Sequence, residues 1–455
     1  MNNFLNQLTE WTGTVAGQLW GIPAIVLLVG TGLYLTVRLR FIQFRGFRHS
    51  IELISGKYDK KDDPGEVTHF QALSTALSAT VGTGNIAGVA TAIALGGPGA
   101  VFWMWITALV GMASKYASCS LALKFRHIHA DGTVSGGPMY TLLHGLNMPK
   151  LGAAFAFFTL VASFGIGNMV QANSVTDGLT YIFPNAANYK LIIGVVIAIM
   201  VGLVIIGGIR RIAKVTSRIV PFMAIFYCGA ALLILIINVE KIPSAFATIF
   251  NLALNPWAAG GGAIGAAIQY GVARGVFSNE AGLGSAPMAH AAARTKEPVR
   301  EGLVAMMGPF IDTIVICTMT ALVIIIMGAY GDARPDHLTG AALSAYSFEQ
   351  ALGPVGSWVV GFGLMFFAYS TMIAWSYYGL KAFTYLVGDH PVADLGFKLF
   401  FLCFVVLGSS IELSSLIDLS DAIVFIVAIP NLIGLYLLAP LIKSELMAYE
   451  AKHIH

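Results

Sequence analysis

The chain has 455 residues, of which 57% are hydrophobic and only 11% are charged, and its mean hydropathy is +0.77. Soluble domains are roughly 25% charged, so this composition excludes an ordinary soluble enzyme and a disordered protein. The net charge is only +3, and the basic residues are dispersed. No nucleic-acid partner is expected, because phosphate binding needs a clustered basic face. We therefore predict an all-α polytopic membrane protein whose main partner is the lipid bilayer, with no obligate protein partner evident.

About eleven apolar stretches are long enough to cross a bilayer, which needs about 20 mostly apolar residues per helix. In chain order they are Leu19–Val37, Thr68–Leu95, Ala100–Leu123, Leu151–Ile182, Tyr189–Gly208, Val215–Asn238, Ala263–His290, Gly302–Gly328, Val355–Leu386, Leu395–Leu416 and Ala422–Ile442. Lys and Arg gather in alternate connections, which marks those connections as cytoplasmic. The sequence thus predicts a multi-pass protein of the cell membrane, with its N-terminus outside and its C-terminus in the cytoplasm.

Several segments outside this pattern have their own signatures. Phe41–Tyr58 alternates apolar and basic residues, which predicts an amphipathic helix on the cytoplasmic membrane face, with a plain basic loop as the alternative. Gly331–Ser347 is the longest external connection and is either a lid or a simple connector. The four cysteines lie far apart in apolar stretches, which indicates neither a zinc site nor a disulfide framework. We expect small buried side chains at Cys119, Cys228, Cys317 and Cys403.

Two glycine-rich clusters interrupt predicted spans. Thr80–Gly88 (TVGTGNIAG) lies within the second span, and Gly275–Gly284 (GVFSNEAGLG) lies within the seventh. Glycine costs about 1 kcal/mol per residue in a helix interior, and unpaired backbone in hydrocarbon costs several kcal/mol more. We therefore predict that each cluster is a break in its helix, where the free backbone groups face a cavity or a ligand. The alternative is that both clusters are kinks in a packed bundle.

The two breaks divide the core into two sets of five spans. An odd number of spans inverts the second set in the membrane, which is the inverted-repeat pattern of secondary transporters. The expected domains are 1–40 for an extra N-terminal helix, 41–66 for the amphipathic helix and linker, 67–240 for the first repeat, 241–443 for the second repeat and 444–455 for a cytoplasmic tail.

Strings along nearly the whole chain resemble the sodium:alanine (alanine or glycine:cation) symporter family. They are GGPGAVFWMWITALVG (96–111), ATVGTGNIAG (79–88), SGGPMY (135–140), GIGNMVQANS (165–174), FSNEAGLGSAP (277–287) and AWSYYG (374–379). The resemblance implies the five-plus-five fold of the bacterial leucine transporter, in the amino acid/polyamine/cation superfamily. It also implies symport of L-alanine or glycine with Na+, with D-alanine and serine as further candidates, and no organic cofactor.

The breaks predict where a zwitterion binds. The half-helix that begins near Gly84 offers free N–H groups and a positive dipole end to a carboxylate, and glycines allow a close approach. The carboxylate residues are Thr83 and Gly84 through their backbones, with Gly82 and the hydroxyls of Thr80 and Thr83 nearby. For the ammonium group we expect carbonyls near Phe277 and Ser278, with the Asn279 side chain.

Polar and aromatic residues of other spans complete the predicted substrate site. Gln171 and Asn173 are two residues apart on a helix and point in different directions, so Gln171 is preferred, with Asn173 second and helix–helix contact as the alternative. Trp375 is expected to cap a small side-chain pocket, unless it is ordinary core.

The resemblance implies one Na+ between the second and ninth spans. Its ligands would be the carbonyls of Ser78 and Val81, the carbonyl of Phe367, and the hydroxyls of Ser370 and Thr371. This set suits a hard cation, which prefers oxygen. The alternative is ordinary helix Ser and Thr side chains bonded to their own backbone.

The sequence does not assign a single role to three polar residues near the breaks. Asn85 belongs to the VGxGN string. Glu280 either pairs with the ammonium group or, as preferred, holds the unwound segment together through Arg274 or backbone N–H groups. Asp312 tunes a second ion site, takes up a proton, or pairs with Lys115.

The leading hypothesis is therefore Na+-coupled symport by alternating access, and the runner-up is H+ coupling on the same scaffold through Glu280 or Asp312. A channel is disfavoured because the polar groups cluster at one depth. The sequence holds no HExxH, P-loop or paired catalytic motif, so we predict that the protein is not an enzyme.

Overall fold

The computed structural model is predominantly helical and describes residues 13–14, 17–60, 62–254, 262–331, 334–335, 338–411 and 414–453. In this described part, eight helices are long and apolar enough to cross a membrane, and a bent pair makes a ninth. The first and seventh predicted spans correspond to the shorter apolar run Ile22–Arg38 and to the helix Gly262–Asn279. The fold class is confirmed, while the count of eleven stays a prediction.

The N-terminal region forms one interrupted helix and two short ones. The elements are α2 (Ile22–Ala24), η1 (Ile25–Val29), α3 (Gly30–Arg38), α4 (Ile42–Arg45) and α5 (Phe47–Ile54). The predicted amphipathic segment is thus helical rather than a plain loop, although it is divided in two. Leu53 is buried and the Phe47 ring packs edge-on against Phe310, whereas Phe44 and Ile51 are exposed.

The second predicted span is a broken helix. It consists of α6 (His69–Thr80), a π-helical turn η2 (Gly84–Gly88) and α7 (Val89–Gly96), and the two halves are bent by 54°. A capping box begins α6, because the Thr68 hydroxyl accepts from the Gln71 N–H while the Gln71 side chain accepts from the Thr68 N–H. The first predicted break is therefore present.

The rest of the first half of the chain is a series of long helices joined by short elements. The series is α8 (Ala100–Lys124), β1 (His127–Ile128), β2 (Val134–Ser135), α9 (Pro138–Tyr140), η3 (Thr141–Gly145), α10 (Pro149–Phe164), η4 (Gly165–Met169), α11 (Val170–Ile182), η5 (Pro184–Tyr189), α12 (Lys190–Ile205) and α13 (Gly208–Ile237). Strands β1 and β2 pair antiparallel, His127 with Ser135. The π-helical η4 interrupts the fourth predicted span.

The second half contains the second break. Its elements are η6 (Val239–Lys241), α14 (Ile242–Leu254), α15 (Gly262–Asn279), α16 (Pro287–His290), α17 (Pro298–Ala305), α18 (Met307–Pro309), η7 (Phe310–Cys317) and α19 (Thr318–Ile326). The seventh predicted span, Ala263–His290, is interrupted as expected, but α15 stays helical as far as Asn279, and within the span only the four residues of α16 are helical after the break. Its glycine-rich continuation is coil held by side chains.

Four helices complete the chain, and two of them revise the predicted boundaries. They are α20 (Gly340–Leu352), α21 (Pro354–Val387), α22 (Pro391–Ser410) and α23 (Ser414–His453). From Gly340 onward the expected external connection is helix α20, whose Ser344 hydroxyl donates to the Ile86 carbonyl (2.9 Å). The last helix continues past Ile442 to His453, so the expected tail is helical there.

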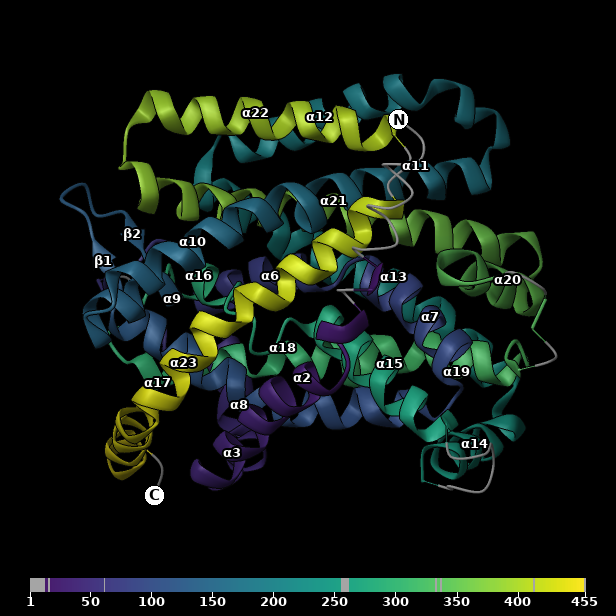
Figure 1. Ribbon diagram of the computed structural model, residues 1–455, viewed down its shortest axis with the longest axis horizontal. Coiled ribbons are helices and arrows are strands. Elements are labelled where there is room, and N and C mark those ends of the chain that lie inside the picture. Colours follow the sequence, from purple (N-terminus) through teal and green to yellow (C-terminus); the bar gives the residue numbers. More distant parts are fainter. Residues whose placement is uncertain are drawn as a thin grey trace.

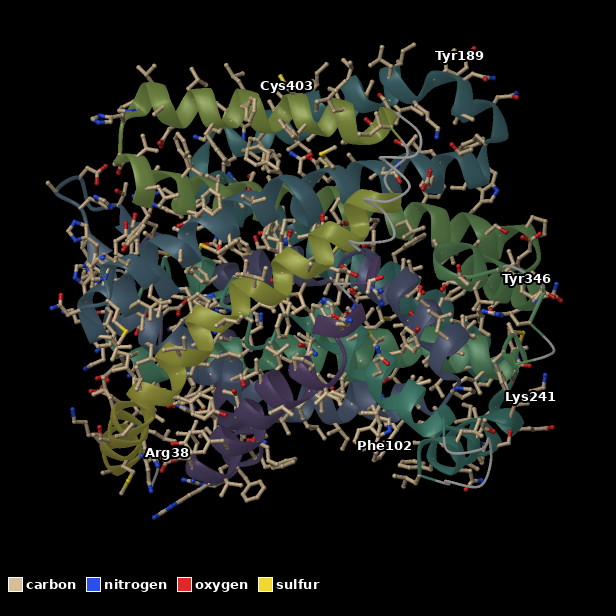
Figure 2. All side chains as sticks on the ribbon, viewed as in Figure 1. Arg38, Phe102, Tyr189, Lys241, Tyr346 and Cys403 are labelled. Carbon is tan, nitrogen blue, oxygen red and sulfur yellow. The ribbon has the colours of Figure 1, made fainter. Side chains whose placement is uncertain are left out.

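Figure 1 shows α12 and α22 side by side along one edge, with α10 and α21 beneath them and α23 crossing the bundle. Helices α8 and α21 are mostly buried, whereas only about a third of the residues in the apolar stretches of α13 and α22 are buried (33% and 28%), as expected for helices that face lipid. Cys403 lies on the exposed edge of α22 (Figure 2), so it is not the buried side chain we expected. Cys119 and Cys317 are buried, and Cys228 is half-buried.

Candidate functional site

Four oxygen atoms meet between α6 and α21. The Thr371 hydroxyl lies 3.1 Å from the Ser78 carbonyl oxygen and 2.9 Å from that of Phe367. The Ser370 hydroxyl lies 2.9 Å from the Phe367 oxygen and 3.4 Å from the Ser78 oxygen. The two contacts to Phe367 are the ordinary helix-backbone bonds that the alternative describes, whereas the two contacts to Ser78 cross to α6. Two hydroxyl protons are thus shared among four buried oxygens, which have more lone pairs than protons. Such a set suits a hard cation, and it contains four of the five residues predicted to bind Na+.

The glycines of the first break let other helices come close to it. A Cβ on Gly82 would lie 2.8 Å from Thr371 Oγ1, and one on Gly84 would lie 3.1 Å from Ser278 Cα. Gly84 therefore stands where the two breaks meet. The Gly82 N–H donates to Asn85 Oδ1 (2.9 Å), so it is occupied within the protein.

The other predicted residues of the first break differ in their surroundings. The Thr80 hydroxyl lies 3.3 Å from the Leu77 carbonyl oxygen of its own helix, which is the ordinary helix contact. Val81 ends α6 with ψ of 87°, so its carbonyl leaves the helical direction. Thr83 and Gly84 begin the next helical segment, and the first N–H groups of a helix lack helical acceptors. The predicted anion site has the required backbone.

Glu280 fixes the second break. It adopts a left-handed conformation with φ of 52°, and Gly282 and Gly284 follow with φ of 87° and 90°. The Ser285 hydroxyl donates to Glu280 Oε2, and the Trp375 indole N–H donates to Oε1 (3.1 Å). Both carboxylate oxygens accept hydrogen bonds within the protein, in keeping with the structural role preferred for this residue.

Asp312 joins the two breaks. Asn85 Nδ2 donates to its Oδ1 (2.7 Å), while the hydroxyls of Ser278 and Thr313 donate to its Oδ2 (2.8 and 2.7 Å). The Cys317 sulfur lies 3.3 Å from both Asn85 Nδ2 and the Ser278 hydroxyl. All three close contacts to the carboxylate are donors, so the arrangement is satisfied by the ionised form.

The side chain of Asn279, at the end of α15, makes its hydrogen bonds within the protein, beside Asp312, and leaves none for a ligand. Asn279 Nδ2 donates to the Thr313 hydroxyl (3.2 Å), and its Oδ1 accepts from the Ala281 N–H (2.9 Å). The predicted ammonium contact of the Asn279 side chain is thus replaced by contacts within the protein. Phe277 lies against Gly84 and carries the Arg274 guanidinium over its ring at 5.4 Å.

Gln171 reaches the first break, and Asn173 does not. Gln171 Nε2 donates to the Ile166 carbonyl (3.0 Å) and lies 3.5 Å from the Thr83 hydroxyl. Its Oε1 is buried and has no hydrogen-bond partner among the described residues. Asn173 instead donates to the Ile411 carbonyl (3.2 Å). The structure therefore brings only the first of the two candidates to the break.

Asn173 lines a separate cavity of about 350 Å³. Asp177 of α11, Ala87 of η2, Ala341 of α20 and Gly361 of α21 also line it. The cavity thus lies beside the half of the broken helix that follows the break, under α20.

Trp375 stands one helical turn from Thr371 and packs against η4. A Cβ on Gly167 would lie 2.5 Å from Trp375 Cβ, so the indole rests directly on this glycine. The Trp375 and Tyr378 rings meet edge to face with centroids 5.5 Å apart. Trp375 is therefore fixed by α21, by η4 and by Glu280 together.

Two ion pairs that the sequence left open as alternatives do not form. Arg274 pairs with Asp421 of α23 (3.5 Å) rather than with Glu280. Lys115 is buried, and its Nζ has no hydrogen-bond partner among the described residues, so it does not pair directly with Asp312. The charges of Glu280 and Asp312 nevertheless both act on Lys115.

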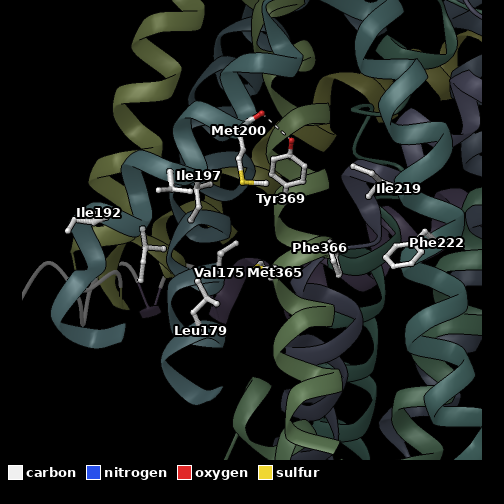
Figure 3. Close-up of a pocket in the computed structure, with 12 residues that line it drawn as sticks. Val175, Leu179, Ile192, Ile197, Met200, Ile219, Phe222, Met365, Phe366 and Tyr369 are labelled. Atoms are coloured by element: carbon white, nitrogen blue, oxygen red, sulfur yellow. Dashed lines mark hydrogen bonds between the residues drawn. The ribbon is translucent and has the colours of Figure 1, made fainter. Parts of the chain in front are cut away.

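A larger groove of about 470 Å³ lies elsewhere, between α11, α12, α13 and α21 (Figure 3). Its lining is apolar apart from Tyr369, whose hydroxyl donates to the Met200 carbonyl (3.1 Å). It offers no charged partner for a zwitterion, so we do not assign the substrate to it. No cluster of three or more His, Cys, Asp or Glu side chains suited to a metal ion occurs within the described ranges.

Sequence reasoning missed several members of the network. The Thr313 hydroxyl donates to Asp312, and the Cys317 sulfur contacts the Ser278 hydroxyl. The Ser285 hydroxyl donates to Glu280, and the Thr320 hydroxyl donates to the Asn85 carbonyl (2.8 Å). Hydroxyls beside an intramembrane carboxylate are a usable signal for Thr313. Ser285 is only five residues from Glu280, but the turn between them hides the contact. Cys317 and Thr320 lie far along the chain from their partners, and sequence spacing gives no sign of them.

This fold and site define a class of protein. The structure matches that of MhsT, a LeuT-fold transporter solved in complex with L-phenylalanine, with a TM-score of 0.55 over 84% of this chain and 99% of that one. Sequence identity is 12%, so the match shows the fold. The molecule is an all-α membrane protein of this fold, with one helix bent at its break and a second interrupted after Asn279. Its sequence relatives are named as transporters and symporters, so it is a transporter and not an enzyme.

The chain belongs to the sodium:alanine symporter family, whose model matches residues 5–455. It is 51% identical to the sodium/alanine symporter AgcS of Methanococcus maripaludis over 443 residues, or 96% of each chain. It is 37% identical to a Bacillus subtilis protein named "Probable sodium/glutamine symporter GlnT", over 98% of this chain and 91% of that one. Membership makes this a cation-coupled amino acid symporter of the cell membrane.

Proposed function

We propose that the protein couples Na+ to the uptake of small neutral amino acids, alanine and glycine first, with serine and D-alanine as further candidates. The observation that carries the proposal is the oxygen set formed by Ser78, Phe367, Ser370 and Thr371. Its neighbours at the first break are backbone N–H groups suited to a carboxylate. The relative AgcS is named as a sodium/alanine symporter.

The buried charges favour Na+ as the coupling ion. Asp312 and Glu280 each accept only donated hydrogen bonds, which favours two ionised carboxylates. Lys115 supplies one compensating positive charge at most. An uncompensated buried charge is costly, so a bound cation is expected to lower the free energy of the core.

We assign the substrate to the junction of the two breaks, where Gly84 lies against Ser278. Its carboxylate lies at the N–H groups of Thr83 and Gly84, and Gln171 Oε1 is the unsatisfied acceptor for its ammonium group, together with carbonyls near Phe277. Trp375, held on Gly167, limits the substrate side chain to a small one.

The coupling mechanism follows from where the ion would bind. Na+ between Ser78 and Thr371 joins the broken helix to α21, so it stabilises the substrate-ready state by binding that state more tightly. The two broken helices then move with their bundle and release both cargoes on the other side. We place the N-terminus outside and the C-terminus in the cytoplasm, and an inward Na+ gradient would drive transport into the cell.

H+ coupling on the same scaffold is the second candidate, with Glu280 or Asp312 as the proton acceptor. The specific observation in its favour is that both carboxylates are buried at the breaks. The hydroxyls of Ser278 and Thr313 beside Asp312, and that of Ser285 beside Glu280, can accept as well as donate, so they would accommodate a protonated carboxyl group.

The test is uptake of labelled L-alanine into proteoliposomes under an inward Na+ gradient, with a K+ gradient and a pH gradient as comparisons. Na+-dependent accumulation supports the proposal, whereas accumulation driven by the pH gradient alone selects H+ coupling. Thr371→Ala is expected to raise the KM for Na+ about tenfold, as loss of about 1.4 kcal/mol does. Ser376→Ala is the matched control, because this buried hydroxyl of α21 donates to Ile373 of its own helix.

A further inference from the structure

A cluster of two histidines and one glutamate lies buried at the end of α6 that is remote from the break. His69 Nδ1 is hydrogen-bonded to Glu301 Oε2, and His290 Nδ1 lies 2.5 Å from Glu301 Oε1. All three side chains are at most 1% exposed. Since His69 begins α6, His290 ends α16 and Glu301 lies in α17, this cluster ties together three elements around both broken helices.

Backbone contacts reinforce the same junction. Val67 and Ala293 form a parallel bridge, and the Glu66 N–H donates to the Ala292 carbonyl (2.8 Å). The Arg126 guanidinium donates to carbonyls of both segments. Its acceptors are Pro64, Ala291, Ala293 and Thr295, at 2.7 to 2.8 Å. The segment before α6 is thus held against the segment after α16.

The geometry of the cluster decides where its protons lie. Both oxygens of Glu301 face an Nδ1 atom, so both histidines carry an Nδ1 proton if the carboxylate is ionised. His69 Nε2 is buried without a hydrogen-bond partner among the described residues, and Asp59 Oδ1 lies 3.9 Å from it. In a neutral ring, the Nε2 lone pair would face a carboxylate. With a second proton, an N–H group faces it instead.

The surrounding charges are mixed. Asp59 and Arg300 act on His69, while Arg126 and Cys119 lie within electrostatic range of Glu301. More distant groups are Asp63 facing Arg126, Tyr449 and His49 facing Arg300, and Arg210 facing Glu66. Asp59 is the carboxylate that faces the open nitrogen of His69.

We propose that His69 is a proton-binding site that bridges Glu301 and Asp59: its Nδ1 proton ties α6 to Glu301 of α17, and a second proton on Nε2 ties α6 to the linker that carries Asp59. In the orientation proposed above this junction lies on the cytoplasmic side, so the latch that these contacts form closes the inner end of the transport path. Loss of the second proton puts a lone pair opposite Asp59, weakens the junction and eases inward opening. The transport part of this inference rests on the proposed function, but the protonation part does not.

The protonation is tested by histidine ¹⁵N NMR of the purified protein between about pH 6 and about pH 8.5. We expect one imidazolium signal at the acid end that His69→Gln removes and that His127→Gln, on the exposed strand β1, leaves in place. Asp59→Asn is the milder variant, because its side chain is partly exposed and its removal leaves the cluster intact. It is expected to move loss of this signal to lower pH, whereas Asp62→Asn in the same linker does not.

The latch is tested by Na+-driven alanine uptake over the same pH range. Uptake by the unmodified protein is expected to increase as the pH is raised. In Asp59→Asn the same increase is expected to begin at a lower pH. Uptake by His69→Gln is expected not to change with pH. A neutral His69 ring throughout the range overturns the proton site. An unchanged pH profile in His69→Gln overturns the latch. Absence of all uptake with the imidazolium signal present would count against the proposed function, not against the proton site.

Discussion

The break between α6 and η2 is short, and its partners are hydroxyl and carbonyl oxygens of α21. The break after α15 is longer, passes through left-handed residues at Glu280, Gly282 and Gly284, and is held by side-chain hydrogen bonds. The first break therefore offers unsatisfied oxygens and backbone N–H groups to cargo, while the second is largely satisfied within the protein. Two glycine clusters that look alike in sequence thus have different surroundings.

The largest loss of uptake is expected from a substitution at Asp312, the side chain that joins the two breaks. Asp312→Asn replaces an acceptor-only group by one that presents N–H groups to the donors of Asn85, Ser278 and Thr313. Uptake is expected to fall to background, and unfolding free energy to fall by about 1–3 kcal/mol for each donor left unsatisfied. Uptake assays and thermal unfolding in detergent measure the two effects. Wild-type Na+-dependent uptake by Asp312→Asn would show that the junction does not need the charge.

A smaller effect is expected from separating the breaks sterically. In Gly84→Ala the new Cβ would lie 3.1 Å from Ser278 Cα, which is backbone and cannot turn aside. Alanine uptake is expected to drop about tenfold, because displacement of closely packed backbone typically costs 1–3 kcal/mol. Gly88→Ala is the matched control in the same π-helical turn, since nothing lies within 4 Å of its Cβ. Equal activity of the two variants would contradict the close crossing.

The smallest effect on transport is expected from a substitution in the second break, after α15, because the proposed ion site lies at the first break. Gly282→Ala places a side chain at φ of 87°, which costs about 1–2 kcal/mol of stability. The melting temperature should fall while the KM for Na+ stays unchanged. Gly282 touches none of the four oxygens that Ser78 of α6 and Phe367, Ser370 and Thr371 of α21 bring together. A raised KM for Na+ in the folded variant would show that the second break also shapes the ion site.

The sequence predicts the breaks well because their signal is local. Glycines in an apolar span are costly, and a row of them marks unwound backbone. Ser370 and Thr371 were singled out by the family resemblance, and what is local is that their hydroxyls and the Phe367 carbonyl one turn earlier lie on one helix. These features required no knowledge of the tertiary arrangement.

Partners across the fold were not predictable in this way. Arg274 was a reasonable partner for Glu280 by proximity in sequence, but it pairs with Asp421 in the last helix. Nothing in the spacing of His69 and Glu301, which are 232 residues apart, indicates that they meet. Helix α20 was hidden because its sequence is short and mixed in polarity, and its support comes from η2 and α21.

The most direct test of the central claim is the L-alanine affinity of the purified protein, measured with Na+ and with K+ at equal ionic strength. The account predicts affinity at least about fivefold higher in Na+, within the usual range of coupling free energies, and loss of that difference in Thr371→Ala but not in Ser376→Ala. Equal affinity in Na+ and K+ would contradict it, because an ion that joins α6 to α21 must favour the state that binds substrate.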